Sequence, residues 1–296
     1  SVLNLNLVDV EKIKSKKIKV VVDAVNSTGG LIVPDFLKEL NVEVVKLYCE
    51  PNGDFPHNPE PLKKNLTELS KKVTECNADL GIAVDPDVDR LVFVCEDGEL
   101  FGEENTLVAC ADYVLSKTPG STVSNLSSSR ALNDITRKHN QVHYYSAVGE
   151  VNVVGKMKKC NAIIGGEGNG GVIYPESHYG RDSIVGIGLF LSLYAQRGLI
   201  ASKLLETFPK YFMVKEKINL SPSLNVDNIL SQIAGKYKNE KIDLVDGVRI
   251  DFKDSWVQLR KSNTEPIIRI YSEAKSIEKA SELIKEIEIL IKNIIS

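Results

Sequence analysis

The alternation of short β-branched runs with longer amphipathic stretches is the feature that most limits what this chain can fold into. Residues 18–22 read Ile-Lys-Val-Val-Val, a turn-forming segment follows, and apolar residues then recur at helical spacing to residue 40. The order returns with a strand at 42–48, a helix around 62–73 and a strand at 80–84. Strands that alternate with helices predict a mainly parallel sheet covered on both faces.

Two further parts follow the first. Helices and strands alternate again from residue 103 to residue 196, whereas beyond residue 210 the pattern is a compact α+β one. A length of 296 residues also favours several domains over one hydrophobic core. We therefore expect two successive α/β domains with mainly parallel mixed sheets, followed by a smaller α+β domain. The predicted domains are residues 1–101, 102–211 and 212–296.

Composition excludes several classes of partner. With 37 Lys and Arg against 40 Asp and Glu, the net charge is −3, so no basic field supports binding to nucleic acid or to an anionic membrane. The five cysteines are scattered and form no C-x-x-C pair, which argues against a disulfide framework or a zinc site. The first residues do not show a charged region followed by a long apolar one, and no apolar run reaches membrane length, so we expect neither a signal peptide nor a membrane span in this sequence. We expect a cytoplasmic protein.

The sharpest local signal is the run Asp-Pro-Asp-Val-Asp-Arg at residues 85–90, between two apolar strands. At alternate positions of an extended backbone, Asp85, Asp87 and Asp89 point to one side, where they can share a hard cation. Magnesium is favoured over calcium because few protein oxygens leave room for water and a phosphate oxygen. An EF-hand is excluded because Arg90 stands where that loop needs glycine. A solvated acidic loop is the alternative.

A second signal is the glycine-rich stretch at residues 165–171, which holds five glycines in seven residues. Such a segment predicts a loop whose backbone can approach a ligand closely. Glu167 and Asn169 supply a charged acceptor and an amide, a pair suited to hydroxyl groups. A strand-like sequence follows instead of a helix, so a dinucleotide-binding loop is a poor match. A plain flexible surface loop is the alternative.

The third signal lies between two predicted strands near the C-terminus. Guanidinium, hydroxyl and amide donors gather there in a way that suits a phosphate dianion, and they belong to Arg260, Ser262, Asn263, Thr264 and Arg269. A polar hairpin with surface arginines is the alternative. The sequence shows no Ser-His-Asp order and no G-x-S-x-G motif.

Together and in this order, the three loops resemble those of the α-D-phosphohexomutase superfamily, which includes phosphoglucomutase, phosphomannomutase and phosphoglucosamine mutase. The resemblance spans nearly the whole chain. It implies that Asp85, Asp87 and Asp89 form a magnesium loop, that residues 166–170 form a sugar-recognition loop, and that the third signal is a phosphate-binding loop.

The resemblance also implies a reaction. In this family a phosphoryl group moves reversibly between C1 and C6 of a hexose, through an enzyme phosphoserine and a hexose 1,6-bisphosphate intermediate that also serves as activator. The substrate is a hexose phosphate, the cofactor is Mg²⁺, and Arg90 is implied as a phosphate or sugar contact.

Two departures from the family pattern shape the expectations. The family carries its phosphoserine on a further N-terminal domain, and no matching Ser-His-Asn-Pro segment occurs here. We expect a chain that corresponds to domains two to four, that folds, that lacks a catalytic nucleophile and that needs the missing domain as a partner. The sugar loop has Asn169 and Gly171 where many relatives have Ser and His, which leaves no general base at position 171.

Alternative predictions remain for both the substrate and the activity. By resemblance to amino-sugar mutases, Asn169 favours glucosamine phosphate as the expected substrate, and mannose or glucose phosphate is the alternative. A non-catalytic sugar-phosphate-binding protein and a purely structural fragment are the rival interpretations.

Overall fold

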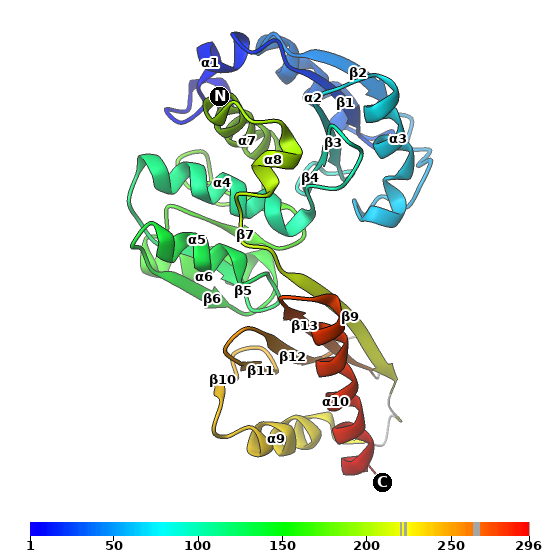
Figure 1. Ribbon diagram of the computed structural model, residues 1–296, viewed down its shortest axis with the longest axis vertical. Coiled ribbons are helices and arrows are strands. Elements are labelled where there is room, and N and C mark those ends of the chain that lie inside the picture. Colours follow the sequence, from blue (N-terminus) through cyan, green and yellow to red (C-terminus); the bar gives the residue numbers. More distant parts are fainter. Residues whose placement is uncertain (220, 222–223, 263–266, 296) are drawn as a thin grey trace. The chain divides into compact units, whose positions relative to one another are not determined.

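The computed structural model describes residues 1–219, 221, 224–262 and 267–295. These residues form two compact units, one of residues 1–145 with 149–209 and the other of residues 146–148 with 210–296. Figure 1 labels their helices and strands. Within the described ranges, no helix combines the length and the apolar character needed to span a membrane.

The larger unit begins with a four-stranded sheet in the order β2-β1-β3-β4. The central strand β1 runs parallel to β2 and β3, whereas β4 is antiparallel to β3. The chain crosses to one side of β1 through α2 and to the other side through α3, so the order reverses between β1 and β3. The elements are β1 (Lys19–Asp23), α2 (Gly29–Glu39), β2 (Glu43–Leu47), α3 (Thr67–Glu75), β3 (Leu80–Val84) and β4 (Leu91–Cys95).

Both faces of this sheet are buried, as the apolar runs predict. Val21 and Val92 pack against α3 in one hydrophobic cluster, while the alternate residues Val20 and Phe93 point to the opposite face and are fully buried as well. Every residue of β3 and β4 is buried. The polar loop between these two strands is therefore held by a rigid, water-free base.

A second sheet of four strands, in the order β6-β5-β7-β8, completes the larger unit. β5 and β7 are parallel and β8 is antiparallel to β7. Here too the strand order reverses beside the first strand, between β5 and β7. The elements are α4 (Glu103–Lys117), β5 (Thr122–Asn125), α5 (Ala131–Lys138), β6 (His143–Ser146), α6 (Glu150–Cys160), β7 (Ile164–Glu167), β8 (Gly171–Ile173) and α7 (Ser183–Arg197).

An aromatic cluster packs β4 of the first sheet against α7, a helix that also contacts β8 of the second sheet. Phe93 of β4 stacks on Phe190 of α7 with ring centroids 3.7 Å apart, and Phe101 meets Phe190 edge to face at 5.1 Å. All three rings are buried. Burial of such large apolar surfaces fixes the end of β3 close to the end of β7.

The glycine-rich stretch differs from its prediction as a loop. Residues 164–167 form β7, residues 171–173 form β8, and both strands are buried. Glycine is needed because the hairpin is tightly packed: a Cβ on Gly166 would lie 2.0 Å from the carbonyl oxygen of Gly171, and one on Gly170 would lie 2.4 Å from that of Leu91. The short helix α5 was not predicted, although Leu132 and Ile135 recur at helical spacing and are buried.

The smaller unit is a five-stranded antiparallel sheet in the order β10-β11-β12-β13-β9. Alternate residues of its central strands, such as Val257 and Leu259, form a core with Ile233 of α9 and Ile287 of α10, so both helices pack on one face. The elements are β9 (Phe212–Asn219), α9 (Val226–Lys236), β10 (Lys241–Asp243), β11 (Val248–Asp251), β12 (Trp256–Lys261), β13 (Ile267–Ala274) and α10 (Ile277–Ile295).

These two α/β sheets and the α+β unit confirm the expected fold class. The remaining elements are short and connect the larger ones: η1 (Val2–Asn4), α1 (Val10–Lys14), η2 (Lys63–Asn65) and α8 (Ala201–Leu205).

Candidate functional site

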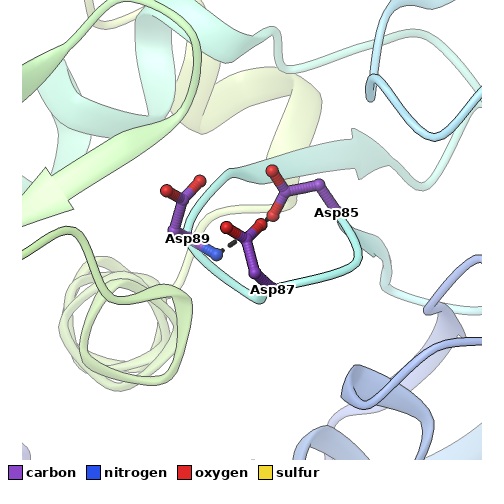
Figure 2. Close-up of side chains that lie close together, drawn as sticks. All are labelled: Asp85, Asp87 and Asp89. Atoms are coloured by element: carbon purple, nitrogen blue, oxygen red, sulfur yellow. Dashed lines mark hydrogen bonds between the residues drawn. The ribbon is translucent and has the colours of Figure 1, made fainter. Parts of the chain in front are cut away.

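The loop between β3 and β4, residues 85–90, brings three carboxylates together (Figure 2). One oxygen atom from each of Asp85, Asp87 and Asp89 lies within 4.8 Å of the others. The backbone is not extended, as the sequence suggested, but turns: Val88 N–H donates to the carbonyl of Asp85 at 3.1 Å, and Val88 has a φ of 61°. The turn, rather than side-chain alternation, gathers the three groups. We call residues 85–90 the metal loop.

Asp85 organises this loop from within. Its Oδ1 accepts hydrogen bonds from the backbone N–H groups of Asp89 (3.0 Å) and Arg90 (2.9 Å). Burial is the main cause that raises the pKa of the Asp85 carboxyl to about 6; the charges of Asp89 and Asp87 act in the same direction, and the N–H donors oppose them. Three close carboxylates are thus costly without a cation.

Two observations show that this cluster suits a magnesium ion. The donors are all carboxylate oxygens, the ligand type that hard divalent cations prefer. In addition, Oδ1 of Asp89 is buried and accepts no hydrogen bond from any described residue, although Arg90 Nε lies 4.0 Å away. A buried carboxylate oxygen with this unused capacity is able to accept a metal bond.

Neighbouring segments support the metal loop. The hydroxyls of Ser27 and Thr28, which follow β1, both donate to the carbonyl of Pro86, at 2.9 and 2.8 Å. Arg90 lies 3.5 Å from Asp85 and 3.4 Å from Glu60 of the proline-rich segment 51–61. The loop therefore stands at the reversal of strand order between β1 and β3, the usual place for a ligand in such sheets.

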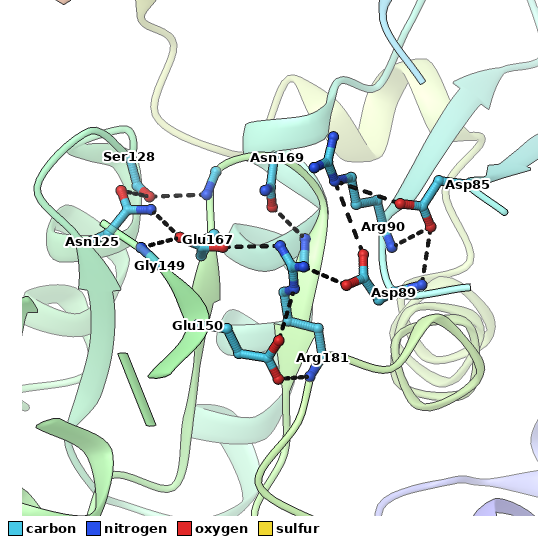
Figure 3. Close-up of polar contacts among 12 residues, drawn as sticks. Asp85, Asp89, Arg90, Asn125, Ser128, Gly149, Glu150, Glu167, Asn169 and Arg181 are labelled. Atoms are coloured by element: carbon cyan, nitrogen blue, oxygen red, sulfur yellow. Dashed lines mark hydrogen bonds and ion pairs between the residues drawn. The ribbon is translucent and has the colours of Figure 1, made fainter. Parts of the chain in front are cut away.

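The hairpin between β7 and β8 holds the second predicted group, and we call residues 166–171 the sugar loop (Figure 3). Glu167 is 5% exposed, and its Oε1 accepts hydrogen bonds from Asn125 Nδ2 (2.7 Å) and Gly149 N–H (3.0 Å). Asn169 is half-buried, and its Oδ1 accepts a hydrogen bond from Gly171 N–H at 3.2 Å. Of the two residues, Asn169 is the more accessible.

Serines near the sugar loop position its backbone. Ser128 is buried, donates to Asn125 Oδ1 at 2.9 Å and accepts from Gly168 N–H at 2.9 Å. Ser129, also buried, accepts from the N–H of Ala131 at the start of α5. These serines hold the loop in place.

Arg181, which the sequence did not single out, connects the two loops. Its Nη1 donates to Glu167 Oε2 at 2.9 Å, its Nη2 donates to Asp89 Oδ2, and its Nε lies 3.5 Å from Glu150 Oε2. The residue lies between β8 and α7, far in sequence from the metal loop. No motif marks it, so only the tertiary structure could reveal it.

His57 is another residue whose role only the structure reveals. Its Nε2 lies 3.0 Å from Asp23 Oδ2 at the end of β1, and its Nδ1 lies 2.8 Å from the carbonyl of Asn58. The hydrogen bond to Asp23 is the main cause that raises the pKa of His57. The pair attaches segment 51–61 to the sheet beside the metal loop.

The third predicted group lies in the smaller unit. Arg260 on β12 is directly opposite Arg269 on β13, so both side chains lie on the face of the sheet away from the core. Arg260 Nε lies 2.8 Å from Asp246 Oδ2, Arg269 is exposed, and Ser262 N–H donates to the carbonyl of Ile267. The predicted residues Asn263 and Thr264 lie outside the described residues.

Three family models match most of the chain. Residues 2–98 match phosphoglucomutase/phosphomannomutase alpha/beta/alpha domain II, residues 103–211 match alpha/beta/alpha domain III, and residues 217–290 match the C-terminal domain. The metal loop falls in the first match, the sugar loop in the second, and Arg260 and Arg269 in the third.

Curated relatives agree with the family models. A phosphoglucomutase/phosphomannomutase of Thermococcus kodakarensis is 39% identical over 95% of this chain, and a probable phosphoglucosamine mutase of Methanopyrus kandleri is 34% identical over 94%. This chain spans 62% of the length of each.

Solved structures share the fold. A phosphoglucomutase/phosphomannomutase family protein of Burkholderia thailandensis superposes with a TM-score of 0.84 at 27% identity, covering 96% of this chain and 63% of that one. An N-acetylphosphoglucosamine mutase of Aspergillus fumigatus, solved with GlcNAc-6P and magnesium, superposes with a TM-score of 0.66 at 13% identity. The superposition covers 96% of this chain and 64% of the A. fumigatus chain, and at this identity it supports only the fold.

Proposed function

The chain belongs to the phosphoglucomutase/phosphomannomutase family, and from that premise we propose that the protein to which it contributes is a phosphohexomutase. The proposed reaction is reversible phosphoryl transfer between C1 and C6 of a hexose phosphate, through an enzyme phosphoserine and a hexose 1,6-bisphosphate. One observation carries the proposal: a cluster of three aspartates suited to a cation is joined, through Arg181, to a hairpin that presents Asn169. Phosphoryl transfer to a sugar needs both functions side by side.

In this proposal Asp85, Asp87 and Asp89 hold one Mg²⁺. When bound, the ion supplies positive charge that offsets the charge on phosphoryl oxygens during transfer. Arg90, a neighbour of the carboxylates, contacts phosphate or sugar oxygens, and Glu60 and Asp85 orient its guanidinium.

The sugar loop recognises hydroxyl groups. Asn169 offers a half-buried amide, and Glu167 contributes a carboxylate whose position is fixed by Asn125, Gly149 and Arg181. The rigid burial of Glu167 favours recognition of one sugar orientation at a time, because its oxygens cannot follow a misplaced hydroxyl.

The smaller unit binds the phosphate that does not react. Arg260 and Arg269 are the charged donors, with Ser262, Asn263 and Thr264 as positioning groups. The register of β12 and β13 supports this assignment, because it places two guanidiniums opposite each other on one face, and only Arg260 has a carboxylate, Asp246, beside it among the ion pairs of the described residues.

Glucosamine phosphate is the proposed substrate, on the strength of Asn169 and of relatives such as the probable phosphoglucosamine mutase of M. kandleri. Because another relative is named phosphoglucomutase/phosphomannomutase, mannose and glucose phosphates are the second candidate substrates. Turnover of the three phosphosugars by the full-length protein decides between them, and a clear preference for mannose phosphate would reverse the proposal.

We further propose that residues 1–101, 102–211 and 212–296 act as three domains of a cytoplasmic enzyme whose phosphoserine lies outside these 296 residues. Ser128 and Ser129 are buried in contacts that position backbone, which supports a nucleophile elsewhere. The five cysteines are free thiols, in keeping with a reducing compartment.

A coupled assay tests the proposed function. The 296-residue chain is given hexose 1-phosphate, its 1,6-bisphosphate and Mg²⁺, and the assay is repeated with the full-length protein. We expect turnover only with the full-length protein. Phosphosugar binding without turnover by the full-length protein would favour the non-catalytic binder, and turnover by this chain alone would return the search for a nucleophile to Ser127, Ser128 and Ser129.

A further inference from the structure

Arg181 is placed so that one side chain reaches both loops of the site. We propose that Arg181 is a positioning residue that latches the metal loop to the sugar loop, and that it can do so because residue 171 has no side chain. The inference rests on the proposed function, in which the first loop holds the metal and the second meets the sugar. It adds a role for a residue that neither loop contains.

The contacts show the latch directly (Figure 3). The two Nη atoms of Arg181 point to different loops, one to Asp89 and the other to Glu167, while its Nε and backbone N–H face Glu150 at 3.5 and 3.1 Å. The side chain is only 14% exposed. A planar guanidinium is suited to this task, because its fork can donate to two carboxylates at once in a fixed geometry.

The latch depends on space left open at Gly171. A Cβ at this position would lie 2.3 Å from Arg181 Cδ and 3.0 Å from Cγ, so even alanine would force the arginine to move. The backbone of Gly171 is not in the left-handed region, so its conformation does not itself require glycine. The absence of a side chain is therefore explained by the path of Arg181.

Backbone contacts support the loops at different points. Leu91 N–H donates to the carbonyl of Gly170 at 3.1 Å, and Ser183 N–H donates to that of Val88 at 3.0 Å. These bonds fix main-chain positions and do not involve the carboxylates of Asp89 and Glu167. Asn125 and Gly149 donate to Oε1 of Glu167, which leaves its Oε2 for Arg181. Arg181 donates to both Glu167 Oε2 and Asp89 Oδ2, so it holds these two carboxylates at a fixed distance from each other.

The test compares variants of this chain by amide hydrogen exchange without metal. Arg181→Ala removes the latch, Gly171→Ala displaces it without loss of charge, and Arg181→Lys can satisfy only one carboxylate at a time. Arg197→Ala, which removes an arginine bonded to Asp112 outside the site, is the control for the loss of an arginine. Gly155→Ala, where an added Cβ meets nothing within 4 Å, controls for the glycine change.

We expect the amides of Asp89 and Arg90, and those of Gly168 and Gly171, to exchange about tenfold faster in Arg181→Ala and Gly171→Ala. The exchange rates of the amides in β1 should not change, and this result would distinguish a local effect from a general loss of stability. The same amides should exchange no faster in the double variant Gly171→Ala/Arg181→Ala than in Arg181→Ala. The proposal would be wrong if exchange in Arg181→Ala were unchanged, or if the effects of the two substitutions on the exchange rates added up in the double variant.

A second arm adds Mg²⁺. In the parent chain, we expect the metal to slow exchange in both loops, and in Arg181→Ala to slow it only in the metal loop, with Arg181→Lys between them. Equal protection of the sugar loop in Arg181→Ala would refute the latch. No protection of residues 85–90 in the parent chain would instead refute the proposed metal site, and the metal-free comparison would still decide the latch.

Discussion

The carboxylates of the larger unit and the arginines of the smaller unit are prepared for ligands in opposite ways. Glu167 is buried and engaged by three donors, and Asp85 is buried and bonded to two backbone N–H groups. Arg269 is exposed, and Arg260, 23% exposed, has Asp246 beside its Nε. The larger unit is thus organised before a ligand arrives, and the smaller unit presents charge to solvent. Substitutions should accordingly affect folding in the first and binding in the second.

The largest effect is expected for Glu167→Ala. The change leaves Arg181 without one of its buried partners and Asn125 without an acceptor, so it should lower the free energy of unfolding by about 3 kcal/mol. Urea denaturation of this chain measures the loss, with Glu167→Gln as the conservative comparison. A loss below about 1 kcal/mol would contradict the preorganised character of the larger unit.

Arg260→Ala tests the other side of the comparison. Removal of one charged donor should weaken binding of hexose phosphate about tenfold or more, while the free energy of unfolding changes by less than about 1 kcal/mol because the pair with Asp246 is partly exposed. Titration calorimetry and urea denaturation give the two values. Unchanged affinity would remove Arg260 from the phosphate site.

Asp87→Asn separates metal binding from folding inside the larger unit. Asp87 is exposed, so its charge contributes to the cluster but not to the core. Magnesium affinity should fall about tenfold, while unfolding of the metal-free chain stays within about 0.5 kcal/mol of the parent. Calorimetry that shows equal magnesium affinity would withdraw Asp87 as a ligand.

The smallest effect is expected for His57→Gln, and it depends on pH. Because Asp23 raises the pKa of His57 in the folded state, the pair stabilises the protein fully below the unfolded pKa of about 6.5, and this stabilisation is lost as pH rises through the folded value. The variant should therefore be less stable than the parent by about 1 kcal/mol at about pH 5.5 and equal to it at about pH 9. A stability difference that does not change between these pH values would contradict the raised pKa and would show that the imidazole acts only as a neutral packing group.

Local sequence signals were sufficient for most of the fold. Apolar runs such as residues 80–84 and 91–95 are buried on both faces, and burial of this kind leaves a plain signature in composition. The α+β pattern predicted beyond residue 210 is confirmed by a sheet whose alternate residues, such as Val257 and Leu259, form the core. The glycine-rich hairpin was wrongly predicted as a loop because glycine signals both open loops and places where backbones touch.

The sequence alone determined most of the order of the elements, the presence of two α/β parts before an α+β part, and the residue types at the proposed metal, sugar and phosphate loops, because periodicity and motif spacing are local properties. Only the tertiary structure decided that the metal loop is a turn, that Arg181 joins Asp89 to Glu167, and that His57 pairs with Asp23.

These pairings join residues that are distant along the chain. Arg181 lies 92 residues from Asp89 and 14 from Glu167, and His57 lies 34 residues from Asp23. The stacking of buried Phe93 on Phe190 packs β4, which follows Asp89, against α7, which follows Arg181, and this packing is consistent with the contact between Arg181 and Asp89. Long-range contacts of that kind depend on how whole elements pack, which no local pattern encodes.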